Sequence, residues 1–421
     1  MKPCHVVCFR LLRGNRKVDN SYAAPPSDKA ALSPGTLSVL LSVVFFDNLG
    51  YAIVFPYLFF FATSLGADAF VYGLILSAYS LMAFLFTPIV ARLSDRYGRR
   101  TILLPALLFS GLSYITFGLA NALWLLFLGR MIAGTTAATV PVAQAYVADV
   151  TTEKQRLKYL GWTSAAGGLA FIVGQAIGGV LSGFFGYALP SFVAAGLAFA
   201  NLISAYFLLS EPKRSHDDPE KSAPTLAALK NVLRKREVLL LFAVYFMFFI
   251  SFVFLQTVVP PWLGTLFGYG PLETSYLFAY IGVAVVVTQA LVLPRLARKR
   301  SNTTLAFYGI VLLGLGLLIL GAFSFLFLLV FVGALIAVGF GILITSLSTL
   351  ISLKAPKEAQ GGSLGIAWSL AALAQTIGPA VAAYSFAVGV SVGWVGFAFV
   401  LAAVVTLSTI PLLLNLKKHD S

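Results

Sequence analysis

The chain consists mainly of long apolar runs separated by short polar turns. Twelve of these runs reach about 20 residues, the length that a helix needs to cross a hydrocarbon core about 30 Å thick. The predicted spans are residues 36–62, 71–91, 101–120, 123–149, 158–184, 188–210, 238–266, 273–293, 303–321, 324–351, 361–387 and 391–414. The pattern therefore predicts an all-α membrane protein with twelve transmembrane helices.

One polar interruption, residues 211–237, is much longer than the other connections and leaves six spans on each side. Its last part, residues 226–236, is basic and amphipathic, so it is either a helix on the membrane surface or a solvated linker with a few helical turns. We therefore divide the chain into five parts: an N-terminal tail (1–34), a six-helix bundle (35–210), a linker (211–237), a second six-helix bundle (238–415) and a short tail (416–421).

The two bundles carry traces of an internal repeat. Gly161 and Gly174 lie thirteen positions apart in the fifth span, and Gly365 and Gly378 have the same spacing in the eleventh. A Glu-x-Gln sequence, in the second case beginning at Glu358, precedes each pair. Repeated membrane halves place a substrate site near the bilayer midplane at their interface, which is the architecture of a transporter.

Composition supports the membrane assignment. Hydrophobic residues make up 59% of the 421 positions and charged residues only 10%, whereas soluble proteins are about a quarter charged. The net charge of +14 could indicate a nucleic-acid partner, but 28 of the 29 Lys and Arg residues fall on one side of a twelve-span topology. This positive-inside pattern explains the charge without nucleic acid and predicts that both termini are cytoplasmic.

The sequence contains few groups suited to covalent or redox chemistry. Cys4 and Cys8 both lie in the polar first tail, so no disulfide framework is implied. We find no phosphate-binding loop, metal-ligand cluster or nucleophile constellation in the sequence. We therefore expect no cofactor, no metal and no enzymatic activity.

Several motifs occur in order along the first five spans. These are Ala91-Arg-Leu-Ser-Asp-Arg-Tyr-Gly-Arg-Arg100 after the second span, Leu128-Gly-Arg-Met-Ile-Ala-Gly134 in the fourth and Gly174-Gln-Ala-Ile-Gly-Gly179 in the fifth. They resemble the cytoplasmic-loop, fourth-helix and antiporter motifs of the major facilitator superfamily, with alanine replacing the first loop glycine and Gln175 replacing the usual proline. Asp47-Asn-Leu-Gly50 and Ala145-Tyr-Val-Ala-Asp149 are similar to sequences in tetracycline-efflux and related drug:proton antiporters.

The resemblance implies two pseudo-symmetric six-helix bundles that rock around a central site. It also implies that Asp95 and its neighbouring arginines latch the cytoplasmic side closed, with Asp95 against the eleventh helix. A carboxylate such as Asp95 at the amino end of a helix contributes about 0.3 to 1 kcal/mol of stabilisation. The alternative to a latch is that this turn only sets the membrane topology, a role that needs the positive charges alone. The residues assigned to this gate are Asp95, Arg96, Gly98, Arg99, Arg100 and Asp149.

Asp47 and Arg130 are the acid and base in the interior of the predicted spans. Asp47 lies roughly 17 Å from the cytoplasmic end of its span and Arg130 roughly 11 Å from the outer end, at about 1.5 Å per residue. An unpaired charge at this depth costs at least about 2.5 to 3.5 kcal/mol, so we expect the two groups to pair or to share water. They are either a proton-coupling pair or a static ion pair.

Aromatic and amide side chains on the central helices are the candidates for the substrate cavity, with packing against lipid as the alternative for each ring. These candidates are Asn48, Tyr51, Phe55, Gln144, Tyr245, Phe249, Gln256, Gln289, Trp368 and Gln375. The residues assigned to the antiporter motif are Gly174, Gln175, Gly178 and Gly179, and its glycines allow the fifth span to approach a neighbouring helix closely. The interiors of the last six spans carry no acid, base or histidine. The tetracycline pumps that the chain resembles typically carry further charged or histidine groups in that half, so this departure disfavours tetracycline itself and a two-site proton relay.

These features predict a monomeric secondary transporter of the cell membrane that exports a lipophilic or amphiphilic small molecule in exchange for protons. Uptake or facilitated diffusion of a small organic solute is the first alternative, because Gln175 departs from the antiporter motif. A transporter-like receptor that binds a ligand without moving it is the second.

Overall fold

The computed structural model describes residues 34–151, 153–211, 235–323, 325–356 and 360–417. Within these ranges the chain is almost entirely helical and contains no strand, and twelve helical spans are long and apolar enough to cross a membrane. The predicted all-α fold is confirmed. The first tail with Cys4 and Cys8, most of the linker and Glu358 lie outside the described residues.

The first bundle differs from the predicted spans at two breaks. Its helices are α1 (Pro34–Val54), α2 (Leu58–Ser64), α3 (Ala69–Tyr97), α4 (Arg99–Gly118), α5 (Leu123–Thr135), α6 (Thr139–Val150), α7 (Glu153–Phe185) and α8 (Ala188–Leu208). The first break lies at Pro56, which has no amide proton for the helical ladder. The second break divides the fourth span at residues 136–138. There the Thr136 hydroxyl donates a hydrogen bond to the Ala133 carbonyl, and the backbone amides bond to carbonyls three residues earlier, which makes a tighter turn than an α-helix.

The second bundle repeats this six-span arrangement. Its elements are α10 (Arg236–Phe267), α11 (Pro271–Val287), the π-helical segment η2 (Thr288–Val292), α12 (Leu293–Ala297), α13 (Asn302–Ala322), α14 (Leu326–Lys354), α15 (Gln360–Ser391), α16 (Phe397–Leu407) and α17 (Ile410–Lys417). Wide π-helical turns interrupt α-helices where the hydrogen-bond ladder is locally disturbed. Here Pro294, just beyond η2, cannot donate to that ladder.

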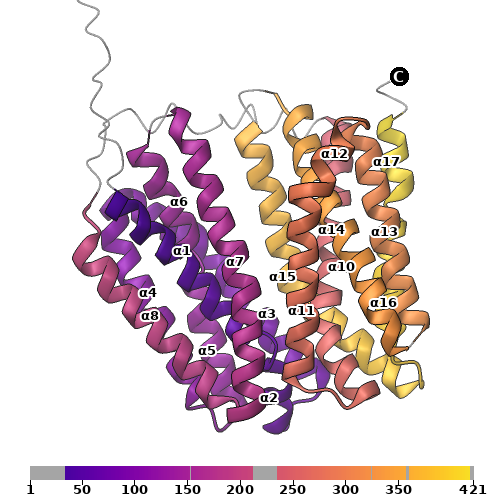
Figure 1. Cartoon of the computed structure of the whole chain (residues 1–421), viewed down its shortest axis with the longest axis horizontal. Coiled ribbons are helices and arrows are strands. Elements are labelled where there is room, and N and C mark those ends of the chain that lie inside the picture. Colours follow the sequence, from indigo (N-terminus) through magenta and orange to yellow (C-terminus); the bar gives the residue numbers. More distant parts are fainter. Residues whose placement is uncertain (1–33, 152, 212–234, 324, 357–359, 418–421) are drawn as a thin grey trace, which may run out of the picture.

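The two bundles lie side by side, with α1–α8 from indigo to magenta and α10–α17 from salmon-pink through orange to yellow (Figure 1). They touch mainly through two helix pairs, α3 with α15 and α7 with α11. We call the membrane end that carries residues 92–100 and 295–300 the basic end. Among the described residues, the connections at the opposite end contain no Lys or Arg.

The bundles are in close contact at the opposite end. A Cβ placed on Gly73 of α3 would lie 2.6 Å from the Pro379 carbonyl of α15, and one placed on Gly179 of α7 would collide with Ser275 of α11. Glycine is therefore required at both contacts, because any side chain would separate the helices. The rings of Phe55 and Phe278 also meet across this junction, with centroids 5.6 Å apart.

At the basic end the same four helices are apart. A Cβ placed on Gly161 or Gly168 of α7, or on Gly365 of α15, would have no atom of the described chain within 4 Å beyond its own helix. Trp368 of α15 is 58% exposed and Ile89 of α3 is 50% exposed. The ribbons accordingly diverge toward the upper, basic end in Figure 1. The structure is thus closed at the opposite end and open at the basic end.

The close contact at Gly179 makes a testable prediction about this arrangement. We expect Gly179→Val to force α7 away from α11 and to lower the population that is closed at the opposite end, because the new side chain collides with Ser275. Spin labels at the exposed positions Phe184 and Tyr276, in a chain with Cys4 and Cys8 replaced by serine, should show longer distances.

The matched control is Gly161→Val in the same helix, which has free space around it. It should leave the label distances unchanged. Equal shifts in both variants would mean that the contact at Gly179 does not hold the opposite end closed.

Candidate functional site

Arg130 of α5 is a buried cation in the centre of the first bundle, with only 2% of its surface exposed. Its guanidinium carbon lies 5.6 Å from the ring centroids of Tyr51 and Tyr79 and 5.7 Å from that of Phe117. Each such contact contributes about 2 kcal/mol or more when it is desolvated. Three helices, α1, α3 and α4, therefore supply an aromatic cage for one charge.

Two glycines bring the cage together. A Cβ placed on Gly129 would lie 2.9 Å from the Phe117 ring, and one placed on Gly134 would collide with the backbone carbonyl of Tyr79. Because neither position carries a side chain, α5 can approach α4 on one side and α3 on the other. The spacing of glycine around Arg130 thus sets the distance between the cation and its rings.

Asp47 of α1 lines the same small cavity as Arg130, together with Tyr79 and Tyr114. The structure therefore brings the predicted acid and base to the same depth. The two side chains form no ion pair within 4 Å. Two nitrogens of the Arg130 guanidinium, Nε and one of the terminal pair, have no hydrogen-bond partner in the described chain. The cavity has about 20 Å³ of free volume, enough for about one water molecule between the two groups.

A second small cavity lies between the bundles, directly beside the first. Its wall on the first bundle includes Tyr51, Tyr79 and Arg130, and its wall on the second bundle includes Gln256 of α10 and Gln375 of α15. Three side chains therefore face both cavities. These three side chains therefore connect the surroundings of Asp47 to the interface between the bundles.

The other cavity candidates divide into three groups. Phe55 also lines the cavity between the bundles. Tyr245, Phe249 and Trp368 form an aromatic cluster in the second bundle, in which Phe249 lies 5.0 Å from Tyr245 and 6.3 Å from Trp368 between ring centroids. The remaining candidates, Asn48, Gln144 and Gln289, line neither central cavity; Asn48 instead donates to the Val44 carbonyl.

The antiporter-motif glycines pack α7 against two neighbours. Gly174 and Gly178 face the backbone of α1, whereas Gly179 faces α11 across the bundle interface. Gln175 lies between these two faces, is fully buried, and has no hydrogen-bond partner in the described chain for either amide atom. A buried unsatisfied polar group costs about 1 to 3 kcal/mol, so the Gln175 amide offsets part of the stabilisation that this packing of α7 provides.

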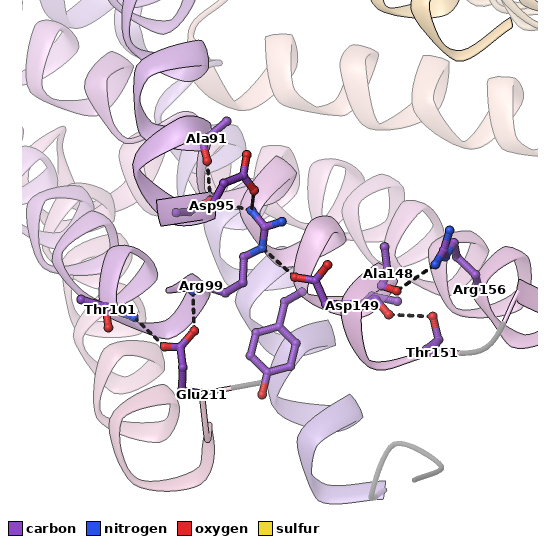
Figure 2. A network of polar contacts seen from close by, with 12 residues as sticks. Ala91, Asp95, Arg99, Thr101, Ala148, Asp149, Thr151, Arg156 and Glu211 are labelled. Carbon is purple, nitrogen blue, oxygen red and sulfur yellow. Dashed lines mark hydrogen bonds and ion pairs between the residues drawn. The ribbon is translucent and has the colours of Figure 1, made fainter. Parts of the chain in front are cut away.

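A network of charged side chains surrounds the turn between α3 and α4 at the basic end (Figure 2). Arg99 lies 2.5 Å from an Asp95 oxygen and donates from Nε to Asp149 at 2.9 Å. The Arg99 guanidinium also donates to the Ser94 hydroxyl at 2.7 Å. One arginine therefore joins the end of α3 to the end of α6. The Asp95 side chain remains 60% exposed.

The two other gate arginines make different contacts. Arg100 donates to the Tyr206 carbonyl of α8 at 2.7 Å and lies over the Tyr206 ring. Arg96 lies over the ring of its neighbour Tyr97, 5.3 Å from the centroid. Neither pairs with a carboxylate in the described chain, so the ion pairs of this network depend on Arg99.

Glu211, just beyond α8, belongs to the network although the sequence did not identify it. Its carboxylate accepts hydrogen bonds from the backbone amides of Arg99 at 2.6 Å and Thr101 at 3.3 Å, and so caps the first turn of α4. Gly98 has φ +113°, and a Cβ there would lie 2.7 Å from the Glu211 carboxyl carbon. Because Glu211 lies 112 positions from Arg99 in the sequence, no local sequence pattern at the start of α4 could identify it as the cap.

Comparison with known proteins identifies related chains along most of this sequence. The family profile described as Major Facilitator Superfamily matches residues 40–379. Tetracycline resistance protein, class B, from Escherichia coli is 30% identical over 378 residues, which cover 86% of this chain and 92% of the relative. Multidrug resistance protein 2 from Bacillus subtilis (strain 168) is 28% identical over 266 residues, covering 62% and 66% of the two chains.

A solved structure has the same fold despite low sequence identity. The inward-facing, unoccupied structure of a bacterial homolog of the human lysosomal transporter Spinster superposes with a TM-score of 0.78 at 13% identity. The superposition covers 92% of this chain and 98% of that one. This likeness extends over both bundles.

Removing the Glu211 carboxylate should loosen the turn that it caps. We expect Glu211→Ala to lower the free energy of unfolding by about 1 kcal/mol, as for other lost helix caps, and to raise amide hydrogen exchange in the first turn of α4. Asp68→Ala is the matched control, because Asp68 caps α3 at the opposite end through the Val71 amide. It should raise exchange in the first turn of α3 only. Unchanged exchange of α4 in Glu211→Ala would contradict the capping role.

Proposed function

Because the chain belongs to the Major Facilitator Superfamily, we propose that this transporter exports a lipophilic or amphiphilic small molecule in exchange for protons. The observation that carries the proposal is the shared cavity of Asp47 and Arg130, beside the interface of the bundles. The names of the relatives, which are resistance proteins for tetracycline and for multiple drugs, support export of a drug-like molecule.

The proposed coupling step is a change of partner at Arg130. When Asp47 is protonated it carries no charge, and Arg130 is held by the three rings that surround it, as in this structure. When Asp47 loses its proton, the carboxylate attracts the guanidinium across the small cavity, since opposite charges in a membrane interior pair strongly. Movement of Arg130 would shift Tyr51 and Tyr79, which also face the second bundle.

The positive-inside rule supports a cytoplasmic location for the basic end. With that orientation, the structure is closed to the outside and open to the cytoplasm, the state from which an exporter takes up its substrate. Proton release to the cytoplasm and substrate binding would then occur in the same open state.

The proposed gate closes the cytoplasmic side in the other state. Asp95 is 60% exposed and lies at the end of α3, whose other half packs on α15. If the bundles rock about the contacts at the opposite end, Asp95 approaches the first turn of α15, whose free backbone amides can donate hydrogen bonds to the carboxylate. Arg99 would hold the carboxylate in position through the ion pair that it already makes.

Replacing the proposed proton site tests the coupling. We expect Asp47→Asn to retain expression and ligand binding but to lower proton-driven transport at least about tenfold, because an amide cannot take up the proton that drives the cycle. The measurement is lumenal pH in inside-out vesicles that hold a proton gradient, while a panel of lipophilic cations and neutral drugs is added.

The control is Asp68→Asn, an acid at the opposite end that caps α3. Vesicles that contain this variant should release protons on addition of a substrate to the same extent as vesicles with the unmodified protein. Normal pH-driven flux by Asp47→Asn would defeat the assignment. Absence of any response by the unmodified protein would favour uptake or facilitated diffusion, to be tested with sugars, organic acids and amino acids.

The gate is tested by removing its charge. We expect Asp95→Asn to increase the fraction of molecules open to the cytoplasm, since an amide binds helix-end amides about 0.3 to 1 kcal/mol less favourably than a carboxylate. Single cysteines at Gly161 and Gly365, which face free space here, should react faster with a thiol reagent in that variant. Equal reaction rates with and without the substitution would count against the latch.

A further inference from the structure

A groove between α13 and α17 opens at the basic end of the second bundle. It is lined by Thr303, Thr304 and Phe307 of α13 and by Leu413 and Leu414 of α17, and it encloses about 200 Å³. This volume is about ten times that of either central cavity. The groove lies on the outside of the bundle, where Leu414 is 45% exposed, so its walls are within reach of lipid.

The groove is apolar except at the end beside the basic turn. The side chains of Phe307, Leu413 and Leu414 can bury hydrocarbon, whereas Thr303 and Thr304 begin α13 next to the membrane surface. A ligand that fits has a hydrocarbon chain along α13 and a polar group at its first turn. An acyl lipid has this shape.

The charge beside the groove favours one kind of head group. Arg298, Lys299 and Arg300 lie in the turn between α12 and α13, are all exposed, and form no ion pair within the described chain. Among the described residues at this end of the second bundle, Glu237 is an acid that already has a partner, since it lies 3.2 Å from Lys354. Within the described part of the chain these three cations have no carboxylate partner, and an anion is the complement to them.

We propose that this groove and the turn at residues 298–300 bind one anionic phospholipid. The acyl chain lies between α13 and α17, and the phosphate lies at the guanidinium and ammonium groups of the turn. A zwitterionic lipid fills the groove but leaves the cations less well compensated. A free phosphate compensates the cations but leaves the groove without hydrocarbon. The proposal does not depend on the direction or coupling of transport.

The test is native mass spectrometry of the full-length protein in detergent, titrated with phosphatidylglycerol or phosphatidylcholine. Each cation near an anionic lipid contributes about fivefold in affinity, the equivalent of about 1 kcal/mol. We expect the unmodified protein to bind phosphatidylglycerol at least about tenfold more tightly than phosphatidylcholine. The triple variant Arg298→Gln/Lys299→Gln/Arg300→Gln should lose most of this preference.

The control for charge is Arg92→Gln/Arg156→Gln/Lys158→Gln, which removes three cations from the basic end of the first bundle and leaves the second bundle, which holds the groove, unchanged. It should keep the preference. Equal losses in the two triple variants, or equal affinities for the two lipids in the unmodified protein, would refute the site and leave only a general attraction to anionic surfaces.

The control for shape is Leu414→Trp, which fills the groove and leaves every charge in place. It should weaken phosphatidylglycerol binding severalfold, and the unmodified protein should bind glycerol 3-phosphate, which lacks acyl chains, far more weakly than the lipid. Undiminished lipid binding by Leu414→Trp, or equally tight binding of glycerol 3-phosphate, would contradict the assignment of the groove to an acyl chain.

Discussion

The burial of one guanidinium in the middle of the membrane is the constraint on which the first bundle depends. Arg130 is 2% exposed and is compensated by three rings from three different helices. That compensation requires α5 to lie close to both α3 and α4, which the glycines on either side of the arginine permit. The cost of an uncompensated charge at this depth, at least about 2.5 kcal/mol, therefore fixes the spacing of these helices.

One long helix connects this central charge to both ends of the molecule. Along its length, α3 carries Gly73 at the contact with α15, Tyr79 in the cage of Arg130 and Asp95 in the charged network. Because its backbone is continuous from Ala69 to Tyr97, these three sites move together if the bundle rotates as a unit. Such a helix can link a local event at the centre to opening at one end and closure at the other.

The two bundles share an architecture but have different chemistry. The interior charges lie in the first bundle, whereas the second contributes amides and rings such as Gln256, Gln375 and Phe249 to the centre. A chain with 13% identity has the same fold over almost its whole length, so the helix arrangement does not need these particular side chains. The fold supports many functions, and the site determines which one a chain performs.

The amino-acid sequence by itself determined the twelve membrane spans, the basic end, the charged turn and the similar depth of Asp47 and Arg130. These features depend on local composition and on the fixed rise of a helix, which one segment specifies without its neighbours. The tertiary structure alone decided that Asp47 and Arg130 share a cavity without an ion pair, that Glu211 caps α4, and that Gln289 lines neither of the two central cavities. It also decided which end is open. These properties depend on the rotation and spacing of helices far apart in the chain, which packing sets and local pattern does not.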